Sequence, residues 1–552
     1  MPILDAAELA AGPAHSGAVA GAPSYDYVIV GGGAAGCVLA ARLSEDPGVS
    51  VLVLEAGPAH AGVAEILDAS LWVSLLRGPY DWGYDYAPAP HVDGRVIAIP
   101  RGRVLGGSSS INAMMWYRGH PRDYDLWAES GATGWDYETL LPYFRLVEDW
   151  EGGASKERGA GGPMRVERSR NPHPLATAML EAAGELGMPV LDDPNGPSNH
   201  GAGYANFNAT TTPEGRMERW STARGYLEPA LARPNLTVAT GAQVLRVVLE
   251  GSRAAAVAYA GTRAAGSGSG SASAESVVRA ERGVVMAAGA IDTPRLLMFS
   301  GIGDPAELSA VGIGVAHALP GVGRNYQDHP LLQGMTFRAK EPLGPVRDNG
   351  GGSMVNWMSS HADGRPDLHA FVAQGPQANP GLQQLYPLGD GPLFAVSPGL
   401  MGTRSVGWLK LRSADPSVPA EVQPNFYAEP EDLDALADGV EAVLELLSTS
   451  AYRELSEGPV VPSARLITAR ERRQFVRTAT ETFFHSCGTA KMGTDEEAVV
   501  GPDLAVHGLE GLWVADASVI PVIPSCNTLP VVLAVAERAA ELIDGRSRLP
   551  GD

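Results

Sequence analysis

"YDYVIVGGGAAGCVLAARLSED", residues 25–46, is the stretch that decides the fold of this chain. Residues 27–30 form a β-branched strand that meets a cluster of glycines, and residues 34–43 predict an Ala- and Leu-rich helix directly afterwards. The next stretch, "VSVLVLEAG" at residues 49–57, predicts a second buried strand that ends at Glu55. This order of strand, glycine turn, helix and strand predicts a β-α-β unit of the dinucleotide-binding type.

Three glycines at the first turn have the spacing that a pyrophosphate site needs. Gly31 permits the tight turn, Gly33 lets the backbone approach a pyrophosphate, and Gly36 allows close packing of helix on strand. The helix N-terminus adds partial positive charge for the phosphates. Glu55 lies 19 residues past Gly36, where a carboxylate accepts hydrogen bonds from ribose hydroxyls. A structural glycine turn with a solvated Glu55 is the alternative.

The bulk composition is that of an ordinary globular protein. The chain has 552 residues, so two or more packed units are expected, and 45% hydrophobic against 19% charged residues provides ample core material. The formal charge of -22 opposes broad contact with nucleic acid and disfavours an anionic substrate. The sequence shows no apolar run long enough to span a bilayer and no metal-ligand spacing.

The cysteines and the N-terminal residues bear on the location of the protein. Cys37, Cys487 and Cys526 are too few for a disulfide framework and indicate a reducing compartment. Residues 1–24 contain no Lys or Arg and no continuous apolar core, both of which a secretory signal needs. We therefore expect a cytoplasmic protein with a loose N-terminal tail.

Two further regions suggest how the rest of the chain is organised. Residues 261–276, "GTRAAGSGSGSASAES", are of low complexity and lie between two strand-like runs, which predicts a long hairpin tip. Residues 330–480 have a different texture, with short strands, many prolines and a predicted helix near residues 429–449. This change predicts a second domain.

Several longer segments resemble those of one known family. Residues 102–125 read "GRVLGGSSSINAMMWYRGHPRDYD" and residues 289–303 read "GAIDTPRLLMFSGIG". They resemble the two signature segments of the glucose–methanol–choline (GMC) flavin oxidoreductases, and "LPGVGRNYQDHP" (319–330) and "HSCGTAKMG" (485–493) are similar to further family segments. The resemblance covers roughly residues 25–545, and its pattern is closest to the choline dehydrogenase, hydroxymethylfurfural oxidase and aryl-alcohol oxidase types.

The resemblance implies a fold and a division into domains. The fold class is α/β (α+β), with a Rossmann-like FAD-binding domain and a second, substrate-binding domain built on an antiparallel sheet with flanking helices. The expected division is a flexible tail at residues 1–24, a discontinuous FAD-binding domain at residues 25–164, 216–329 and 481–552, and a substrate-binding domain at residues 165–215 and 330–480.

The cofactor that the resemblance implies is FAD. The small-residue run "LGGSSSIN" lets the backbone lie against a large planar ring, and in the family this loop wraps FAD. Ile111 occupies a position where a relative bonds FAD through histidine, so non-covalent FAD is expected. Trp82 and Val244 fall where the family contacts the adenine half, with ordinary packing as the alternative. The full set of expected cofactor-binding residues is Gly31, Gly33, Ala34, Ala35, Gly36, Glu55, Ala56, Trp82, Gly107, Ser108, Asn112, Ala113, Met114, Met115, Val244, Phe484, Asp516, Ala517 and Thr528.

The resemblance also implies a catalytic pair, His485 and Asn527. Oxidation of an alcohol needs a proton removed from oxygen and a hydride removed from carbon, and histidine suits the proton near neutral pH. The amide of Asn527 can hold the substrate oxygen without competing for its proton. The alternatives are a buried core histidine and a helix N-cap, since Pro530 follows Asn527. His329 in "NYQDHP" is expected to be structural.

We therefore expect FAD-dependent oxidation of a small primary alcohol, aryl or furanic, to the aldehyde, with molecular oxygen or another electron acceptor. Phe483 and Phe484 precede His485 and favour such an alcohol over a choline-like cation. The alternatives are a choline-type or other alcohol dehydrogenase with a non-oxygen acceptor, and a non-redox member, either a hydroxynitrile lyase or a light-driven fatty-acid decarboxylase. A non-catalytic flavoprotein is a further alternative.

Overall fold

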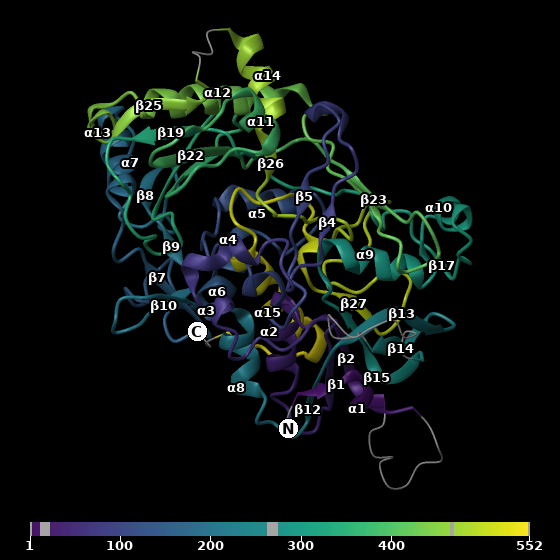
Figure 1. The fold of residues 1–552 in the computed structure, drawn as a ribbon. Helices are drawn as coiled ribbons and strands as arrows, with labels where there is room; N and C mark the ends of the chain where they lie inside the picture. The colour runs from purple at the N-terminus through teal and green to yellow at the C-terminus, as the bar shows by residue number, and fades with distance from the viewer. Residues whose placement is uncertain (1–2, 11–21, 262–273, 464–467, 550–552) are drawn as a thin grey trace.

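The computed structural model of the chain describes residues 3–10, 22–261, 274–463 and 468–549. Two eight-stranded sheets organise these residues, one with mainly parallel and one with antiparallel pairing (Figure 1). The fold class is therefore α/β (α+β), as predicted.

The first sheet carries the glycine motif. Its order is β1-β12-β3-β2-β15-β14-β13, with β27 also paired to β15. Helix α2 spans Ala34–Leu43, the predicted range, and connects β2 to β3, which pair in parallel with Val28 opposite Leu52. Both residues are fully buried, as expected for a parallel sheet covered on both faces. The strands are β1 Leu4–Asp5, β2 Ser24–Val30, β3 Val51–Leu54, β12 Leu236–Thr240, β13 Ala242–Glu250, β14 Arg253–Gly261, β15 Ser276–Met286 and β27 Leu512–Val514.

The N-terminal residues differ from the expected loose tail. Leu4–Asp5 form β1, which pairs in parallel with β12 at the sheet edge, and Ala6–Ala10 form α1. Asp5 and Glu8 cap the first turn reciprocally, with each backbone N–H donating to the other side chain at 2.8 Å. Leu9 is buried, so this short element gains its order from the sheet edge and the capping box. Residues 11–21 lie outside the described part of the chain.

The predicted hairpin is present on both sides of its tip. β14 pairs antiparallel with β15, with Val257 opposite Val278. The tip itself, residues 262–273, lies outside the described residues.

The second sheet forms the upper half of the molecule in Figure 1. Its order is β25-β19-β22-β21-β20-β8, with β18 joining β22 to β26. The predicted helix near residues 429–449 is α12, Pro430–Leu446, which lies against this sheet together with α7 and α14. The strands are β8 Gly201–Tyr204, β18 Pro330–Leu332, β19 Thr336–Ala339, β20 Ser353–Trp357, β21 Leu368–Ala373, β22 Leu393–Leu400, β25 Ser456–Val461 and β26 Thr480–Thr482.

Smaller elements fill the space around the sheets. The remaining helices of six or more residues are α5 Pro121–Glu129, α6 Tyr137–Val147, α7 Pro174–Glu185, α9 Gly289–Phe299, α10 Pro305–Ala310, α11 Pro380–Leu385, α13 Ser450–Leu455, α14 Ala469–Ala479 and α15 Leu529–Asp544. The short strands are β4 Tyr84–Asp85, β5 Ala98–Ile99, β6 Glu148–Trp150, β7 Met164–Arg168, β9 Asn206–Phe207, β10 Ala209–Thr211, β11 Met217–Arg219, β16 Ile302–Gly303, β17 His317–Ala318, β23 Trp408–Lys410 and β24 Glu421–Gln423. None of the helices in the described ranges is both long and apolar enough to cross a bilayer.

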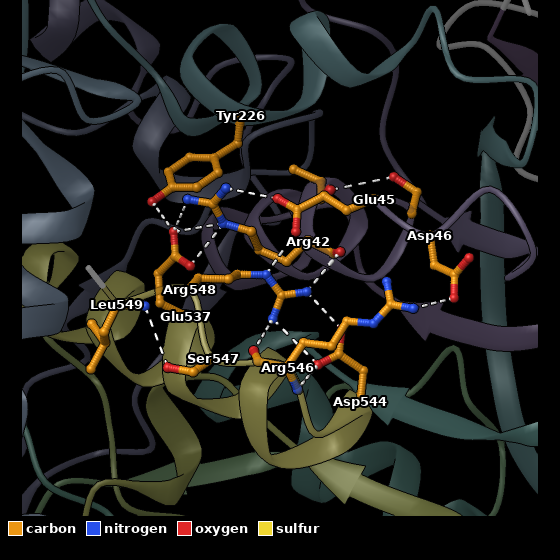
Figure 2. A network of polar contacts seen from close by, with 12 residues as sticks. Arg42, Glu45, Asp46, Tyr226, Glu537, Asp544, Arg546, Ser547, Arg548 and Leu549 are labelled. Atoms are coloured by element: carbon orange, nitrogen blue, oxygen red, sulfur yellow. Dashed lines mark hydrogen bonds and ion pairs between the residues drawn. The ribbon is translucent and has the colours of Figure 1, made fainter. Parts of the chain in front are cut away.

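The C-terminal helix packs against the first helix of the dinucleotide unit. Figure 2 shows the polar contacts that join them: Arg42 of α2 donates to Glu537 of α15 from Nε at 2.8 Å and from Nη2 at 2.8 Å. Tyr226 donates to the same carboxylate at 2.7 Å, and the Glu537 side chain is fully buried. A buried ion pair with two hydrogen bonds fixes the relative position of α2 and α15. The start of α15 is thereby fixed relative to the glycine turn.

Candidate active site

A cavity of about 720 Å³ lies between two parts of the molecule, the first half built around the mainly parallel sheet and the second half built around the antiparallel sheet. Its walls come from the ends of β2 and β3, the loop before η3 (Gly107–Ser110), the start of α15 and several strands of the second sheet. Of the predicted site residues, only Gly36 does not line it. Those that line it are Gly31, Gly33, Ala34, Ala35, Glu55, Ala56, Trp82, Gly107, Ser108, Asn112, Ala113, Met114, Met115, Val244, Phe484, His485, Asp516, Ala517, Asn527 and Thr528.

The glycine turn has the close backbone approaches that its motif predicts. A Cβ on Gly36 would lie 1.9 Å from the Gly31 carbonyl oxygen, so Gly36 serves the packing of α2 on β2. Gly107 has φ +53, and a Cβ there would lie 2.8 Å from Gly33 Cα. The backbone of the Gly107 loop therefore packs against the backbone at the start of α2. Gly33 is the N-cap residue of α2 and provides no side chain to cap it. These features fit an anionic pyrophosphate at the helix N-terminus.

Glu55 is buried at the end of β3 and is held by backbone groups. One of its oxygens accepts from Gly32 N at 2.8 Å and the other from Gly57 N at 2.7 Å. Burial raises the pKa of Glu55 to about 7. Each oxygen keeps capacity for another donor, so the expected contact with a ribose hydroxyl stays a prediction that the geometry allows.

The region predicted for the adenine half contains an aromatic stack. Trp82 stacks on Tyr84 with ring centroids 5.8 Å apart and planes at 9°. The guanidinium of Arg103 lies 5.0 Å from the Trp82 ring. Val244 on β13 also lines the cavity and is 8% exposed. Aromatic and apolar side chains of this kind suit a purine ring.

The loop that carries Asn112 is rigidly held. Asn112 Oδ1 accepts from Met114 N at 3.1 Å and from the guanidinium of Arg219 at 2.7 Å. Ile111 in the same loop is 2% exposed, and its hydrocarbon side chain has no group that could bond to a cofactor. Non-covalent cofactor binding is consistent with this.

His485 and Asn527 lie side by side at the cavity wall. Asn527 Nδ2 is 3.2 Å from His485 Nε2, although 42 residues separate them in sequence. Asn527 Oδ1 is buried and has no hydrogen-bond partner among the described residues. The pair therefore offers one ring nitrogen and one amide at the cavity wall, and a hydroxyl group that replaces their mutual hydrogen bond can contact both.

A tight turn aims His485 at the cavity. Phe484 has φ +66, an unusual conformation for a residue other than glycine. Its N–H donates to Thr482 Oγ1 at 2.7 Å, and its carbonyl accepts from Arg101. His485 N then donates to Asp328 Oδ1 at 2.7 Å. These contacts hold the strained turn in place.

The segment just before Asn527 is held in place by a buried ion pair. Ser525 Oγ donates to Asp123 Oδ2 at 2.7 Å, and Arg365 of the second half pairs with the other oxygen of Asp123. The Asp123 side chain is fully buried. These contacts hold the segment that precedes α15 against residues from both halves of the molecule.

His329, which is expected to be structural, contacts the predicted base directly. His329 Nδ1 lies 2.9 Å from His485 Nδ1, and His329 is fully buried. The contact arises because β18 pairs with β26, which places Pro330 opposite Thr482. In the sequence, the only signal for this histidine was its position in the family-like segment "NYQDHP".

Burial keeps both histidines neutral. Burial lowers the pKa of His329 to about 3. Burial lowers the pKa of His485 well below its ordinary value, and the charge of Arg101, with those of His329 and His369 once they are protonated, lowers it further. At neutral pH the donor Asn527 Nδ2 faces Nε2 of His485, so the single proton of that ring is on Nδ1 and donates to His329.

The fold and the cavity define a dinucleotide-dependent enzyme with a polar pair at the cofactor cavity. The chain belongs to the GMC oxidoreductase family, since the family's N-terminal model matches residues 25–331 and its C-terminal model residues 403–536. It is accordingly an FAD-dependent oxidoreductase that acts on CH–OH donors.

Individual relatives agree over nearly the whole chain. Mitochondrial choline dehydrogenase of Homo sapiens is 39% identical over 557 residues, covering 95% of this chain and 90% of the relative. Oxygen-dependent choline dehydrogenase of Brucella anthropi is 37% identical over 544 residues, covering 95% and 96%. The crystal structure of pyridoxine 4-oxidase from Mesorbium loti has a TM-score of 0.87 at 31% identity, covering 95% of this chain and 100% of that one.

Proposed function

We propose that this enzyme oxidises a neutral primary alcohol, aryl or furanic, to the aldehyde, with His485 as base and Asn527 orienting the substrate oxygen. The observation that carries the proposal is the 3.2 Å separation of His485 Nε2 and Asn527 Nδ2 at the wall of the cofactor cavity. A hydroxyl group that replaces the hydrogen bond between this base and this amide can contact both of them.

The proton pathway follows from the hydrogen bonds of His485. An alcohol replaces the hydrogen bond between Asn527 Nδ2 and His485 Nε2: its O–H donates to the Nε2 lone pair, and the Asn527 amide then donates to the alcohol oxygen. Proton transfer to Nε2 gives an imidazolium whose Nδ1–H still donates to His329 Nδ1. Bound FAD supplies the acceptor for the hydride that leaves the carbon. The alcohol thus loses one proton and one hydride, and a C=O bond forms.

The charges around the cavity support a neutral substrate. Three carboxylates line it within the described residues, namely Glu55, Asp292 and Asp516. Each accepts hydrogen bonds from neighbouring protein groups, and each lies on the half of the molecule that contains the glycine turn. The walls contributed by the second half carry no carboxylate within the described residues. A quaternary ammonium group would find no counter-charge on those walls and could be held there only against the faces of aromatic rings.

The aromatic groups beside the pair support a flat substrate. Phe483 stacks on His485 with centroids 5.4 Å apart and planes at 5°. Phe371 and His369 lie 6.0 and 5.9 Å from the Phe483 ring. All four rings line the cavity. Such a wall favours aryl and furanic rings through stacking and edge contacts.

The proposal is tested by anaerobic reduction of the enzyme-bound flavin, followed at its visible absorbance. Benzyl and furfuryl alcohols should bleach the flavin faster than choline at equal concentration, and admission of air then shows whether oxygen or another acceptor takes the electrons. Faster bleaching by choline would refute the neutral aryl substrate. Absence of bleaching by every alcohol would refute alcohol oxidation itself.

A further inference from the structure

Arg219 is a fully enclosed cation outside the predicted site. It ends β11 and is 1% exposed. Its Nε donates to the Ile66 carbonyl at 2.9 Å, and its Nη1 donates to the Ser109 carbonyl at 3.2 Å and to Asn112 Oδ1 at 2.7 Å. All three acceptors are neutral oxygens, so hydrogen bonds satisfy part of the guanidinium without balancing its charge.

Arg219 has no carboxylate partner among the described residues. Its Nη2 is buried and also lacks a hydrogen-bond partner there. Burial lowers the pKa of Arg219 to about 9, which still leaves it charged at neutral pH. Arg158 is similarly buried, but it pairs with Glu148 at 2.9 Å and Asp193 at 3.0 Å. Since buried charges are ordinarily paired, the counter-charge of Arg219 should come from a ligand.

The contacts of Arg219 lead to the cofactor cavity. Ser109 and Asn112 belong to the loop that lines the cavity, so Arg219 supports that loop from behind. Asn112 Oδ1 is engaged by Arg219 and by Met114 N, which leaves the Nδ2–H donors of Asn112 for a group in the cavity. A cation bonded to the amide oxygen polarises the amide and strengthens those donors.

We propose that Arg219 balances negative charge on bound FAD, acting through the Asn112 amide as a positioning residue rather than by direct contact. FAD offers two anionic parts to such a residue: the pyrophosphate, which is always charged, and the ring system, which gains negative charge on reduction. The proposal concerns the charge of the cofactor and is independent of which alcohol the enzyme oxidises.

The test compares three full-length variants. Arg219→Met removes the charge at similar volume, Arg219→Lys keeps it, and Arg158→Met is the control, a buried arginine with protein partners outside the cavity lining. The dissociation constant of FAD is measured by fluorescence on apoprotein, and the midpoint potential is measured on FAD-loaded protein. Thermal unfolding of each apoprotein reports the loss of fold separately.

Arg219→Met should weaken FAD binding at least tenfold or shift its potential, and Arg219→Lys should recover most of the loss. A tenfold loss of preference for reduced flavin lowers the two-electron potential by about 30 mV and identifies the ring as the target. Weaker binding at unchanged potential identifies the pyrophosphate. Arg158→Met should lower thermal stability without either effect.

The proposal is overturned if Arg219→Met binds FAD with the wild-type dissociation constant and potential. Should that variant fail to fold, Arg219→Gln serves instead, because it removes the charge and keeps an N–H donor for the neighbouring neutral oxygens. Arg219→Gln should then weaken FAD binding or lower the potential in the same way. Wild-type values for Arg219→Gln overturn the proposal as well.

Discussion

Replacing His329 with leucine should slow the reduction of the flavin by the alcohol while FAD stays bound. In the native structure His485 Nδ1 lies 2.9 Å from His329 Nδ1, and both rings are buried. Leucine removes the acceptor and leaves the His485 Nδ1–H unsatisfied, at a cost of about 1–3 kcal/mol. The ring then loses its preference for the form whose Nε2 lone pair faces the alcohol. Since about 1.4 kcal/mol is tenfold in rate, flavin reduction should slow about 5- to 150-fold.

The assay is stopped-flow reduction of the bound flavin by benzyl alcohol under nitrogen. The limiting rate should fall and the substrate concentration at half-saturation should change little, because His329 does not line the cavity. His329→Asn should recover part of the rate, since an amide oxygen can accept from Nδ1–H. The control is His173→Leu, a buried histidine that caps α7 away from the cavity. An unchanged limiting rate in FAD-loaded His329→Leu would refute the reasoning.

Four further outcomes follow from the site. His485→Ala should slow flavin reduction by about 10²–10⁴-fold while FAD stays bound; a wild-type rate would exclude it as the base. Because burial lowers the pKa of His485, kcat/KM should hold as pH falls through 6.5 and decline only well below it; a half-loss near 6.5 would contradict this. Gly107→Ala should reduce the flavin content of purified protein, since its Cβ would meet Gly33; full occupancy would contradict the backbone contact. Asp123→Ala should lower unfolding free energy by about 3–5 kcal/mol by stranding Arg365, and an unchanged Tm would contradict the buried pair.

The parts of the fold that local sequence determines could be predicted. Residues 34–43 form the predicted helix because a glycine turn starts it and Ala and Leu favour its continuation. The predicted catalytic pair could be named from the family resemblance, but the contact between its two residues depends on how the fold places β26 and α15. Their 3.2 Å separation is a property of the tertiary fold.

Two of the contacts that sequence reasoning missed depend on register or burial. His329 contacts His485 because β18 pairs with β26 with Pro330 opposite Thr482. The local sequence of such short strands does not determine the register in which they pair. Arg219 looks like any surface arginine in sequence, since its lack of a counter-charge appears only when its surroundings are known. The N-terminal helix was missed although Asp5 and Glu8 have the spacing of a capping box.

The pairing of α2 with α15 has a consequence for biosynthesis. A ribosome that has delivered residues up to 480 has made every described strand of the first sheet except β27, but neither His485 nor α15. One wall of the cofactor cavity is then still missing, and Arg42 has no Glu537 to hold. Cofactor loading is therefore expected only after α15 has been made. A nonsense mutation late in the gene should yield colourless protein rather than a partly active enzyme.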